Sequence, residues 1–466
     1  MTISLKTKLT ELPVEASKSL LPEIRNLLQQ SQRTIFVLDD DPTGTQTVYD
    51  TPVLTTWSQE AIQQEWQQGH RLIYILTNSR SLTEPAAREL AKEIGNNIAA
   101  VAKSIEQAFT VISRSDSTLR GHYPAEVDAL ADAIGCTTAP QIIIPYFLQG
   151  GRFTIDDVHY VADADQLIPA SETAFAKDAA FGFQNSNLID WVIEKRQGAI
   201  APSQVTSISL NTLRTSTTDV VTQQLSSLPS GSVCCVNAVS IRDIEVFVAG
   251  LLKAQNAGHE FVFRTAASFV QAYAGLEQRP LLATDAMIDP TIDAGLIIVG
   301  SYVPKTTIQL KHLVDHATDL EAVELQIDLV LQDDNQAYLT EIHSQIDQTL
   351  QSGKNVVLHT SRDLKSGSNA ETSLKIGNQV SNALVQIVQS IERPLRFVIA
   401  KGGITSSDIA TKALAVKRAI VLGQILPGIP VWKTQTESRR PNLSYVVFPG
   451  NVGDESALLQ AYNKLK

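Results

Sequence analysis

The stretch LIYILTNSRSLTEPAARELAKEIGNNIAAVAKSIEQAFTVISRSD, residues 72–116, decides the fold class of this chain. It begins and ends with short apolar runs, LIYILT (72–77) and FTVISRSD (109–116), which have the length and β-branched composition of buried strands. Between them apolar residues recur at helical spacing, with Thr83 suited to be the N-cap and Pro85 to lie in the first turn. This order predicts parallel strands joined by a right-handed crossover helix.

The same alternation continues on both sides of this stretch. A first block has further predicted strands and one clear helical pattern. A second block repeats the arrangement: its first predicted strand begins at residue 296, and the others lie at 322–328, 355–361, 396–403 and 445–450. A segment rich in Gly, Pro and Asp, residues 273–295, separates the blocks. We therefore predict an α/β protein of two lobes, each a mainly parallel sheet flanked by helices, with the active site in the cleft between them. The predicted domains are residues 1–275 and 290–466.

Composition limits the classes of function. The chain has 466 residues, 43% of them hydrophobic, and 49 acidic against 38 basic residues give a formal net charge of -11. This is typical of a globular protein, and the acidic balance argues against nucleic acid or an anionic membrane surface as a main partner. No apolar run is long enough for a transmembrane helix and no secretory signal is evident. Three cysteines, two of them adjacent, indicate no disulfide framework, so we expect a cytoplasmic protein.

Polar clusters follow several predicted strands, which is where open parallel sheets bind ligands. The first strand is followed by Asp39, Asp40 and Asp41 and then by Pro-Thr-Gly. A solvated turn would explain one such carboxylate, but three adjacent ones repel each other, which favours hydroxyl binding, metal binding or general-base chemistry. The third strand is followed by Arg114 to Arg120, whose two arginines, one aspartate and three hydroxyl residues could hold a carboxylate and sugar hydroxyls. The alternative there is a capped helix entry with a surface ion pair.

In the second block the run Lys401-Gly402-Gly403-Ile404-Thr405-Ser406 has the composition of a phosphate-binding loop. Adjacent glycines let backbone N–H groups approach an anion, and the following helix offers its N-terminus. A tight strand-to-helix turn is an equally good explanation of the glycines alone. The P-loop, Rossmann dinucleotide and hydrolase-elbow motifs are all absent from the sequence.

Two histidine patterns lead to different expectations. His312 and His316 are four residues apart on a predicted helix, but no Glu follows the first and no third ligand is near, which favours a solvated helix face over a metal site. His159 follows a Gly-Gly-Arg segment beyond the fourth predicted strand, a position that suits contact with a ligand.

Taken together, these clusters resemble the four-carbon acid sugar kinase family, which has an N-terminal sugar-binding domain and a C-terminal nucleotide-binding domain. The segment Asp40-Asp41-Pro42-Thr43-Gly44 resembles the family's Asp-Asp-Phe-Thr-Gly, and Asp116 to Gly121 resembles its Asp-Ser-Thr-Leu-Arg-Gly. The segment from Gly151 and Arg152 to His159 resembles its Gly-Arg…His element. Gly300-Ser301, Gly402 to Ser406 and Pro449 to Gly453 resemble its nucleotide-contact segments. Pro42 in place of Phe, Thr45 in place of Ala and Ile404 in place of Glu depart from the family pattern.

The resemblance implies an ATP-dependent kinase that phosphorylates a hydroxyl of a small sugar acid, such as threonate, erythronate or an oxo-tetronate, with Mg²⁺ accompanying the nucleotide. Asp41 is our first choice of base and Asp40 the second. The sugar acid is expected at Thr43, Gly44, Arg114, Asp116, Ser117, Thr118, Arg120 and His159. The nucleotide is expected at Ser301, Lys401, Gly402, Gly403, Ile404, Thr405 and Gly450. No metal ligands are assigned, and a homodimer stays open. The alternatives are a catalytically inactive sensor of sugar acid and nucleotide and, less favoured, a hydroxy-acid dehydrogenase.

Overall fold

Residues 72–116 form β4 (Leu72–Leu76), α4 (Glu84–Ser104) and β5 (Phe109–Arg114), the strand–helix–strand order that the sequence predicted. The computed structural model describes residues 3–362, 365 and 370–466, and contacts divide the chain into two units. Unit 1 comprises residues 1–47 and 56–278, and unit 2 comprises residues 48–55 and 279–466.

The main sheet of unit 1 is parallel, as predicted. Each neighbouring pair of its strands runs in the same direction, in the order β10-β11-β6-β12-β5-β2-β4. Its first strand along the chain, β2 (Thr34–Asp39), lies between β4 and β5 and is buried along its whole length. The remaining strands are β6 (Gln141–Ile144), β10 (Val205–Ile208), β11 (Val233–Val236) and β12 (Val262–Thr265). The carboxyl ends of β2, β4, β5 and β12 therefore meet at one edge of the sheet.

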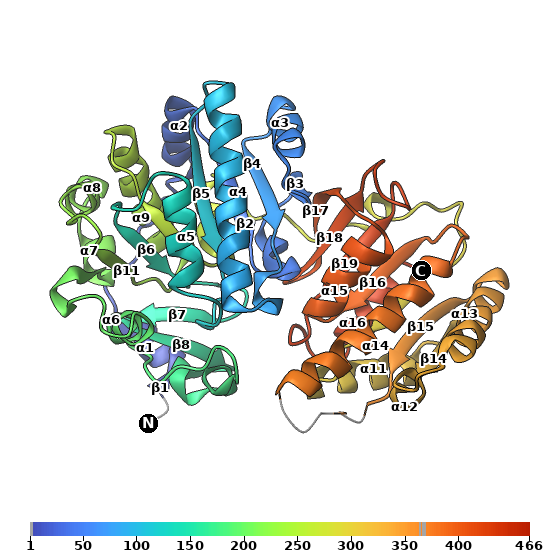
Figure 1. Cartoon of the computed structure of the whole chain (residues 1–466). Coiled ribbons are helices and arrows are strands. Elements are labelled where there is room, and N and C mark those ends of the chain that lie inside the picture. The colour runs from blue at the N-terminus through green and yellow to red at the C-terminus, as the bar shows by residue number, and fades with distance from the viewer. Residues whose placement is uncertain (1–2, 363–364, 366–369) are drawn as a thin grey trace. The chain divides into compact units, whose positions relative to one another are not determined.

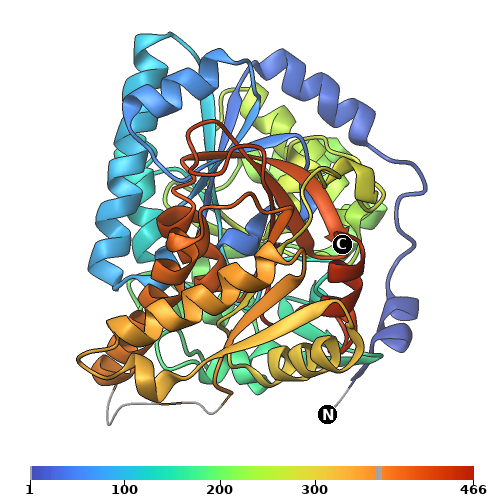
Figure 2. The same cartoon turned by 90° about the vertical axis from the view of Figure 1, so that its right-hand side faces the viewer.

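Helices cover both faces of this sheet (Figures 1 and 2). The long helix α4 packs against α5 (Ala125–Ala133) on one face, while α2 (Leu21–Ser31) packs against α9 (Ile241–Asn256) on the other. The remaining helices of the unit are α1 (Leu5–Glu11), α3 (Gln59–Gln67), α6 (Leu188–Lys195), α7 (Leu210–Thr215), α8 (Thr218–Ser226) and α10 (Ala267–Tyr273). The fold class predicted from strand–helix alternation is confirmed for this unit.

A second, antiparallel sheet of unit 1 was not expected from the sequence. β7 (Arg152–Ile155) and β8 (Val158–Asp163) form a hairpin, which β9 (Gln166–Pro169) and the short β1 (Ile3–Ser4) extend. The hairpin turns at Asp156 and Asp157, whose φ angles are 50° and 65°. Aspartate tolerates this left-handed conformation, and a two-residue turn of this kind suits the twist of a hairpin. The segment around His159 is therefore a strand rather than a loop.

The sheet of unit 2 mixes a parallel half with an antiparallel half. The parallel half, which the sequence predicted without its order, contains β14 (Leu320–Leu325), β15 (Asn355–Thr360), β13 (Leu296–Val299), β16 (Phe397–Lys401) and β19 (Ser444–Phe448) as neighbours in that order. The antiparallel strands β18 (Ile429–Thr434), β17 (Arg418–Leu426) and β3 (Thr51–Leu54) continue from β19. We did not predict this hairpin, nor that β3, from far earlier in the chain, belongs to unit 2.

The core of unit 2 is formed by these strands with α11 (Pro304–His316) and α16 (Ala457–Asn463). α13 (Gln336–Gln351), α14 (Ala370–Ser390) and α15 (Gly403–Asp408) pack against each other, and α12 (Ile327–Val330) is a single turn. His312 and His316 stack on α11 with ring centroids 4.2 Å apart. In the ranges that the structure describes, no group of His, Cys, Asp or Glu could hold a metal ion, and no helix is long and apolar enough to cross a membrane.

Candidate active site

The aspartate triplet lies at the carboxyl edge of the unit 1 sheet, as its position after β2 predicted. Asp39 is the last residue of that strand, and the following turn carries Asp40 and Asp41 into a short 3-10 helix, Pro42–Thr47. The side chains of Asp39 and Asp40 are only 2% and 3% exposed, whereas that of Asp41 is 19% exposed. Of the three carboxylates, Asp41 is therefore the one that a substrate can reach most easily.

Arg114, at the end of β5, neutralises the two buried members of the triplet. Its guanidinium lies 3.1 Å from Asp39 and 3.5 Å from Asp40, and its side chain is 6% exposed. We predicted a substrate contact at Arg114, but this side chain lies beneath the aspartates and is occupied by them. Its position in the fold follows from the pairing of β5 with β2, which places Arg114 directly opposite Asp39.

Arg80 links the triplet to the neighbouring loop, and sequence reasoning missed it. Its guanidinium lies 3.2 Å from Asp40, 2.7 Å from Asp41 and 3.5 Å from Asp116. The residue sits in a one-turn 3-10 helix, Ser79–Ser81, directly after β4. The signal was present in the sequence as Asn-Ser-Arg at the end of the second strand, the same kind of position that identified the other clusters.

Burial and these arginines give the carboxylates different proton affinities. Burial raises the pKa of Asp39 to about 8, against the opposing effect of Arg114, and burial also raises the pKa of Asp40. At Asp41 burial acts in the same direction, but Arg80 and the hydrogen bonds from Thr43 outweigh it and lower the pKa. Asp41 is therefore ionised at neutral pH, as a proton acceptor must be.

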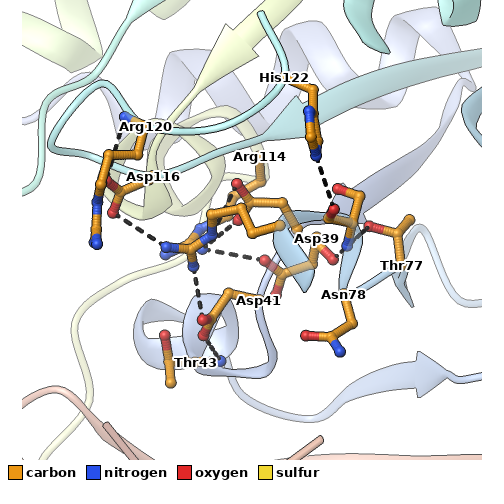
Figure 3. Close-up of polar contacts among 12 residues, drawn as sticks. Asp39, Asp41, Thr43, Thr77, Asn78, Arg114, Asp116, Arg120 and His122 are labelled. Carbon is orange, nitrogen blue, oxygen red and sulfur yellow. Dashed lines mark hydrogen bonds and ion pairs between the residues drawn. The ribbon is translucent and has the colours of Figure 1, made fainter. Parts of the chain in front are cut away.

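The loop after β5 presents a second polar cluster. Burial opposes ionisation of Asp116, but Arg120 and Arg80 outweigh it and lower the pKa of this carboxyl group far below its usual value. Thr118 donates a hydrogen bond to the Asp116 carboxylate. Arg120 Nε also lies 2.9 Å from this carboxylate, and Figure 3 shows Arg120 and Asp116 side by side. Leu119 has a φ of 71°, a conformation that costs a non-glycine residue energy and is often found in functional loops.

The histidine of that loop connects it to the Arg80 turn. His122 Nε2 lies 3.1 Å from the backbone oxygens of both Ser79 and Leu82, and its ring meets Phe181 edge to face at 4.9 Å. The two loops that carry Arg80 and Asp116 therefore hold each other in place.

His159 supports the same loop from behind. Nε2 donates to the backbone oxygen of Ser117 at 2.8 Å, and Nδ1 lies 2.9 Å from Thr154 Oγ1. The side chain is fully buried, and burial lowers its pKa to about 4. We predicted a ligand contact here, but both ring nitrogens are engaged within the protein, so His159 reaches a ligand only through the position of Ser117. Arg264 of β12 has a similar role, since it donates to the backbone oxygen of Arg120 at 2.9 Å.

Thr43 and Gly44 contact Asp41 through their backbone N–H groups. The backbone N–H of Thr43 donates to Asp41 Oδ1 at 2.8 Å, and that of Gly44 to the Asp41 carbonyl oxygen at 3.0 Å. Both contacts orient the most exposed of the three carboxylates. The structure thus brings together in unit 1 the predicted residues Asp40, Asp41, Thr43, Gly44, Asp116, Ser117, Thr118 and Arg120.

In unit 2, three loops meet at the carboxyl ends of β13, β16 and β19. A Cβ atom on Gly300 would lie 2.4 Å from Thr405 Oγ1, and one on Gly402 would lie 2.9 Å from Ser301 Cβ. The third loop joins through Gly450, where a Cβ atom would lie 3.3 Å from Ser301 Oγ. Glycine is therefore needed for the loops to approach so closely, and Gly402 also has a φ of 119°.

The segment after β16 offers backbone donors. Gly403, Ile404 and Thr405 form the first turn of α15, whose N–H groups have no partners within the helix. Ile404 is 61% exposed and apolar, so only its backbone could contact an anion. Such a cradle suits phosphate oxygens.

Lys401 lies below this cradle. Its Nζ donates to the Pro449 carbonyl oxygen at 3.0 Å and sits 4.0 Å from the centre of the Phe448 ring, and its side chain is fully buried. Burial, together with the charge of Lys305, lowers its pKa to about 7. Lys401 thus fixes the loop that leads to Gly450. Arg362, which we did not predict, fixes another loop by donating to the Ser301 carbonyl oxygen at 2.7 Å.

Comparison with known proteins assigns a role to each half of the chain. A family model described as a sugar-binding N-terminal domain matches residues 35–273, more than half of the chain. A second, described as a nucleotide-binding C-terminal domain, matches residues 296–458. The aspartate and arginine cluster falls within the first match and the glycine loops within the second. The prediction that one half binds a sugar compound and the other a nucleotide is confirmed at this level.

Two solved structures share the fold. Haemophilus influenzae protein HI1011, assigned to the DUF1537 family, is 16% identical with a TM-score of 0.62, over 92% of this chain and all of its own. A Salmonella typhimurium LT2 protein provisionally named a tRNA synthase is 18% identical with a TM-score of 0.65, over 93% of this chain and all of its own. At these identities the likeness concerns the fold alone. Among curated proteins, none matches the chain.

Proposed function

The chain belongs to the four-carbon acid sugar kinase family, and on this premise we propose that it transfers the γ-phosphoryl group of ATP to a hydroxyl of a small sugar acid. Threonate, erythronate and oxo-tetronates are the substrates to test first. We propose residues 1–275 as the sugar-acid domain and residues 290–466 as the nucleotide domain.

One observation carries the proposal: Arg80 lies between an ionised, partly exposed Asp41 and an ionised Asp116. A kinase must place an acceptor hydroxyl beside a carboxylate that can take its proton, and must hold both in a fixed orientation. Asp41 has the required charge and accessibility, and Arg80 and the N–H of Thr43 fix its position. Asp39 and Asp40 are buried and have raised pKa values, so they support the site rather than act as its base.

In the proposed reaction, the substrate hydroxyl gives its proton to Asp41. The hydroxyl oxygen then forms a bond to the γ-phosphorus of ATP, and the bond between that phosphorus and the oxygen that bridges it to ADP breaks. Asp116, Ser117 and Thr118 would bind the other hydroxyls, and Arg120, at the open side of Asp116, would interact with the carboxylate. The phosphorylated acid and ADP leave, and Asp41 releases its proton to water.

In the nucleotide domain, the backbone of Gly402, Gly403 and Thr405 would bind phosphate oxygens, with Ser301 and Gly450 beside them. Mg²⁺ would arrive with the nucleotide as MgATP, since this ion keeps several waters and is usually held by phosphates with one or two carboxylates. The part of the chain that the structure describes contains no group of three ligands for a resident metal ion, which fits delivery with the substrate.

A nucleotide-consumption assay over four-carbon sugar acids tests the proposal. We expect the wild type to form ADP from MgATP in the presence of at least one sugar acid. The Asp41→Asn variant should form little or no ADP under the same conditions. Binding of both ligands without ADP formation in the wild type would instead indicate a sensor. Reduction of a nicotinamide cofactor by the same acids, without ATP consumption, would indicate a dehydrogenase.

A further inference from the structure

Two arginines near the site, Arg152 and Arg264, form no ion pair within the described ranges. Arg264 is fully buried and donates to the Arg120 backbone, whereas Arg152 is partly exposed. Arg152 is the first residue of β7, and its backbone is held on both sides, since its N–H donates to the Phe147 oxygen at 2.9 Å and its carbonyl oxygen accepts from Phe147 N–H at 3.1 Å. Its head group is therefore placed by a strand rather than by a mobile loop. In the sequence, Arg152 stands in the segment that resembles the family's Gly-Arg…His element, and no role was predicted for it.

Arg152 is partly exposed, but one nitrogen of its guanidinium is buried and unsatisfied. Its Nε is inaccessible to solvent and makes no hydrogen bond, and in the described ranges no carboxylate lies within 4 Å of the group. By contrast, Arg80, Arg114 and Arg120 each pair with an aspartate. Burial and the nearby charge of Arg120 lower the pKa of Arg152, against the opposing effect of Asp116.

A second cation lies against the same aromatic ring. The Cζ atoms of Arg120 and Arg152 lie 5.0 Å and 5.6 Å from the centre of the Phe175 ring. Two like charges held on one ring repel each other, and the carboxylates beside them are already engaged: Asp116 by Arg80 and Arg120, and Asp178 by Arg120 at 3.7 Å. The ring attracts each cation only modestly, so an anion is needed to balance the pair.

We propose that Arg152, Arg120 and the Phe175 ring form the subsite for the carboxylate of the substrate. The inference rests on the proposed function and specifies which residues select a sugar acid over a neutral sugar. Arg152 supplies the unused donors, Arg120 supplies a second guanidinium whose Nε is held by Asp116, and Phe175 sets the spacing of the two. Arg114, which we had expected in this role, is occupied by Asp39 and Asp40 and does not take part.

The test uses the full chain without nucleotide, so that it does not depend on catalysis. Binding of threonate, erythronate, the neutral polyols threitol and erythritol, and inorganic phosphate is measured by calorimetry and by thermal unfolding. The variant is Arg152→Met, which keeps the length of the side chain and removes its charge. We expect threonate or erythronate to bind the wild type and to lose roughly 30- to 1000-fold in affinity in the variant, while the polyols bind both proteins weakly and equally.

The melting temperature without ligand separates a binding role from a structural one. Removal of a partly buried charge that has no ionic partner should leave the melting temperature unchanged or raise it, and should abolish the increase caused by the acid. Arg196→Met is the matched control, because Arg196 lies 5.6 Å from the Tyr123 ring but pairs with Asp128 at 2.8 Å. That variant should have a lower melting temperature and normal affinity for the acid.

Each remaining outcome overturns the carboxylate subsite. The first is an unchanged affinity for the acids in Arg152→Met, and the second is a lower melting temperature of that variant with an equal loss of affinity for acids and polyols. The other two concern the wild type: it binds inorganic phosphate alone, or it binds neither acid. Failure of the proposed function looks different: the acids bind through Arg152, but MgATP is not consumed. Turnover of a sugar acid that is unaffected by Arg152→Met would keep the kinase and reject the subsite.

Discussion

The carboxylate of Asp39 fills the space beside Gly44 in which any other residue would place its Cβ atom. A Cβ atom built there would lie 2.0 Å from Asp39 Oδ1 and 2.2 Å from Oδ2. Glycine at position 44 is therefore required by packing. It allows a buried carboxylate to remain paired with Arg114 while the chain reverses above it.

Gly44→Ala should displace Asp39 and disturb its pairing with Arg114. We expect the free energy of unfolding to fall by about 3–5 kcal/mol, the scale of breaking a buried ion pair, as measured by urea denaturation. Gly69→Ala is the control, because a Cβ atom there meets nothing within 4 Å and only its φ of 81° is unfavourable. It should cost about 1–2 kcal/mol. Equal costs for the two variants would mean that the Asp39 contact does not matter.

Asp41→Asn should separate chemistry from binding. Asparagine has nearly the same volume, so folding and sugar-acid affinity should survive while kcat falls by roughly 10²–10⁴-fold, the usual contribution of a positioned base. Asp40→Asn should affect kcat less, because Asp40 is buried below Asp41. If both variants turn over normally on the true substrate, the base must be sought at Asp116.

Arg80→Lys should change the pH dependence of the reaction. Arg80 lowers the pKa of Asp41 and contacts Asp40, Asp41 and Asp116 through three different nitrogens. A lysine has one nitrogen and cannot occupy all three positions, so the pKa of Asp41 should rise. The acidic limb of the kcat/KM profile should then move to higher pH, with turnover at neutral pH reduced roughly 10–100-fold by misplacement of the acceptor. Arg71→Lys, just before β4 rather than after it, is the control and should leave the limb in place. An unmoved limb in Arg80→Lys would argue that Asp41 is not the titrating base.

Gly402→Ala should weaken nucleotide binding selectively. An alanine there has both an unfavourable φ and a Cβ atom 2.9 Å from that of Ser301, so the cradle must open at a cost of about 1–3 kcal/mol in ATP affinity. Calorimetry should show unchanged sugar-acid affinity. Gly353→Ala, with a φ of 77° and open space around it, should leave ATP affinity unchanged. Loss of sugar-acid binding in Gly402→Ala would contradict the assignment of this loop to the nucleotide.

His159 should make stability depend on pH in a defined window. Its pKa is about 4 in the folded protein against an ordinary value of 6.5, so the native state excludes a proton that the unfolded chain binds. The stabilisation is complete above pH 6.5 and is lost as the pH falls toward 4. Compared with His159→Gln, the advantage of the wild type should shrink by about 3 kcal/mol between pH 7 and pH 4, measured by denaturant unfolding. A constant difference would show that His159 is protonated in the folded protein or exposed.

The sequence by itself determined the α/β class, the parallel strands and the positions of the polar clusters, because these depend on local periodicity and on the rule that ligands gather at strand ends. Asp41, Asp116, Arg120 and the Gly402-Gly403 pair were found in this way. Residues 418–434 and the β7–β8 hairpin were missed, since their signal is short alternation that becomes informative only when a partner strand is known.

Only the tertiary structure decided which charged side chains pair with each other inside the protein and which remain accessible to a ligand. Arg114 and Arg120 look alike in sequence, and each contacts two aspartates. β5 places the first opposite Asp39 with its side chain only 6% exposed, whereas that of Arg120 is 25% exposed. His159 lies on a strand that turns its ring toward Ser117 rather than toward a ligand. Arg80 gains its importance from aspartates 36 or more residues away, and Arg152 from a ring 23 residues away. The physical reason is that charge pairing, burial and pKa depend on distances between segments that local sequence does not encode.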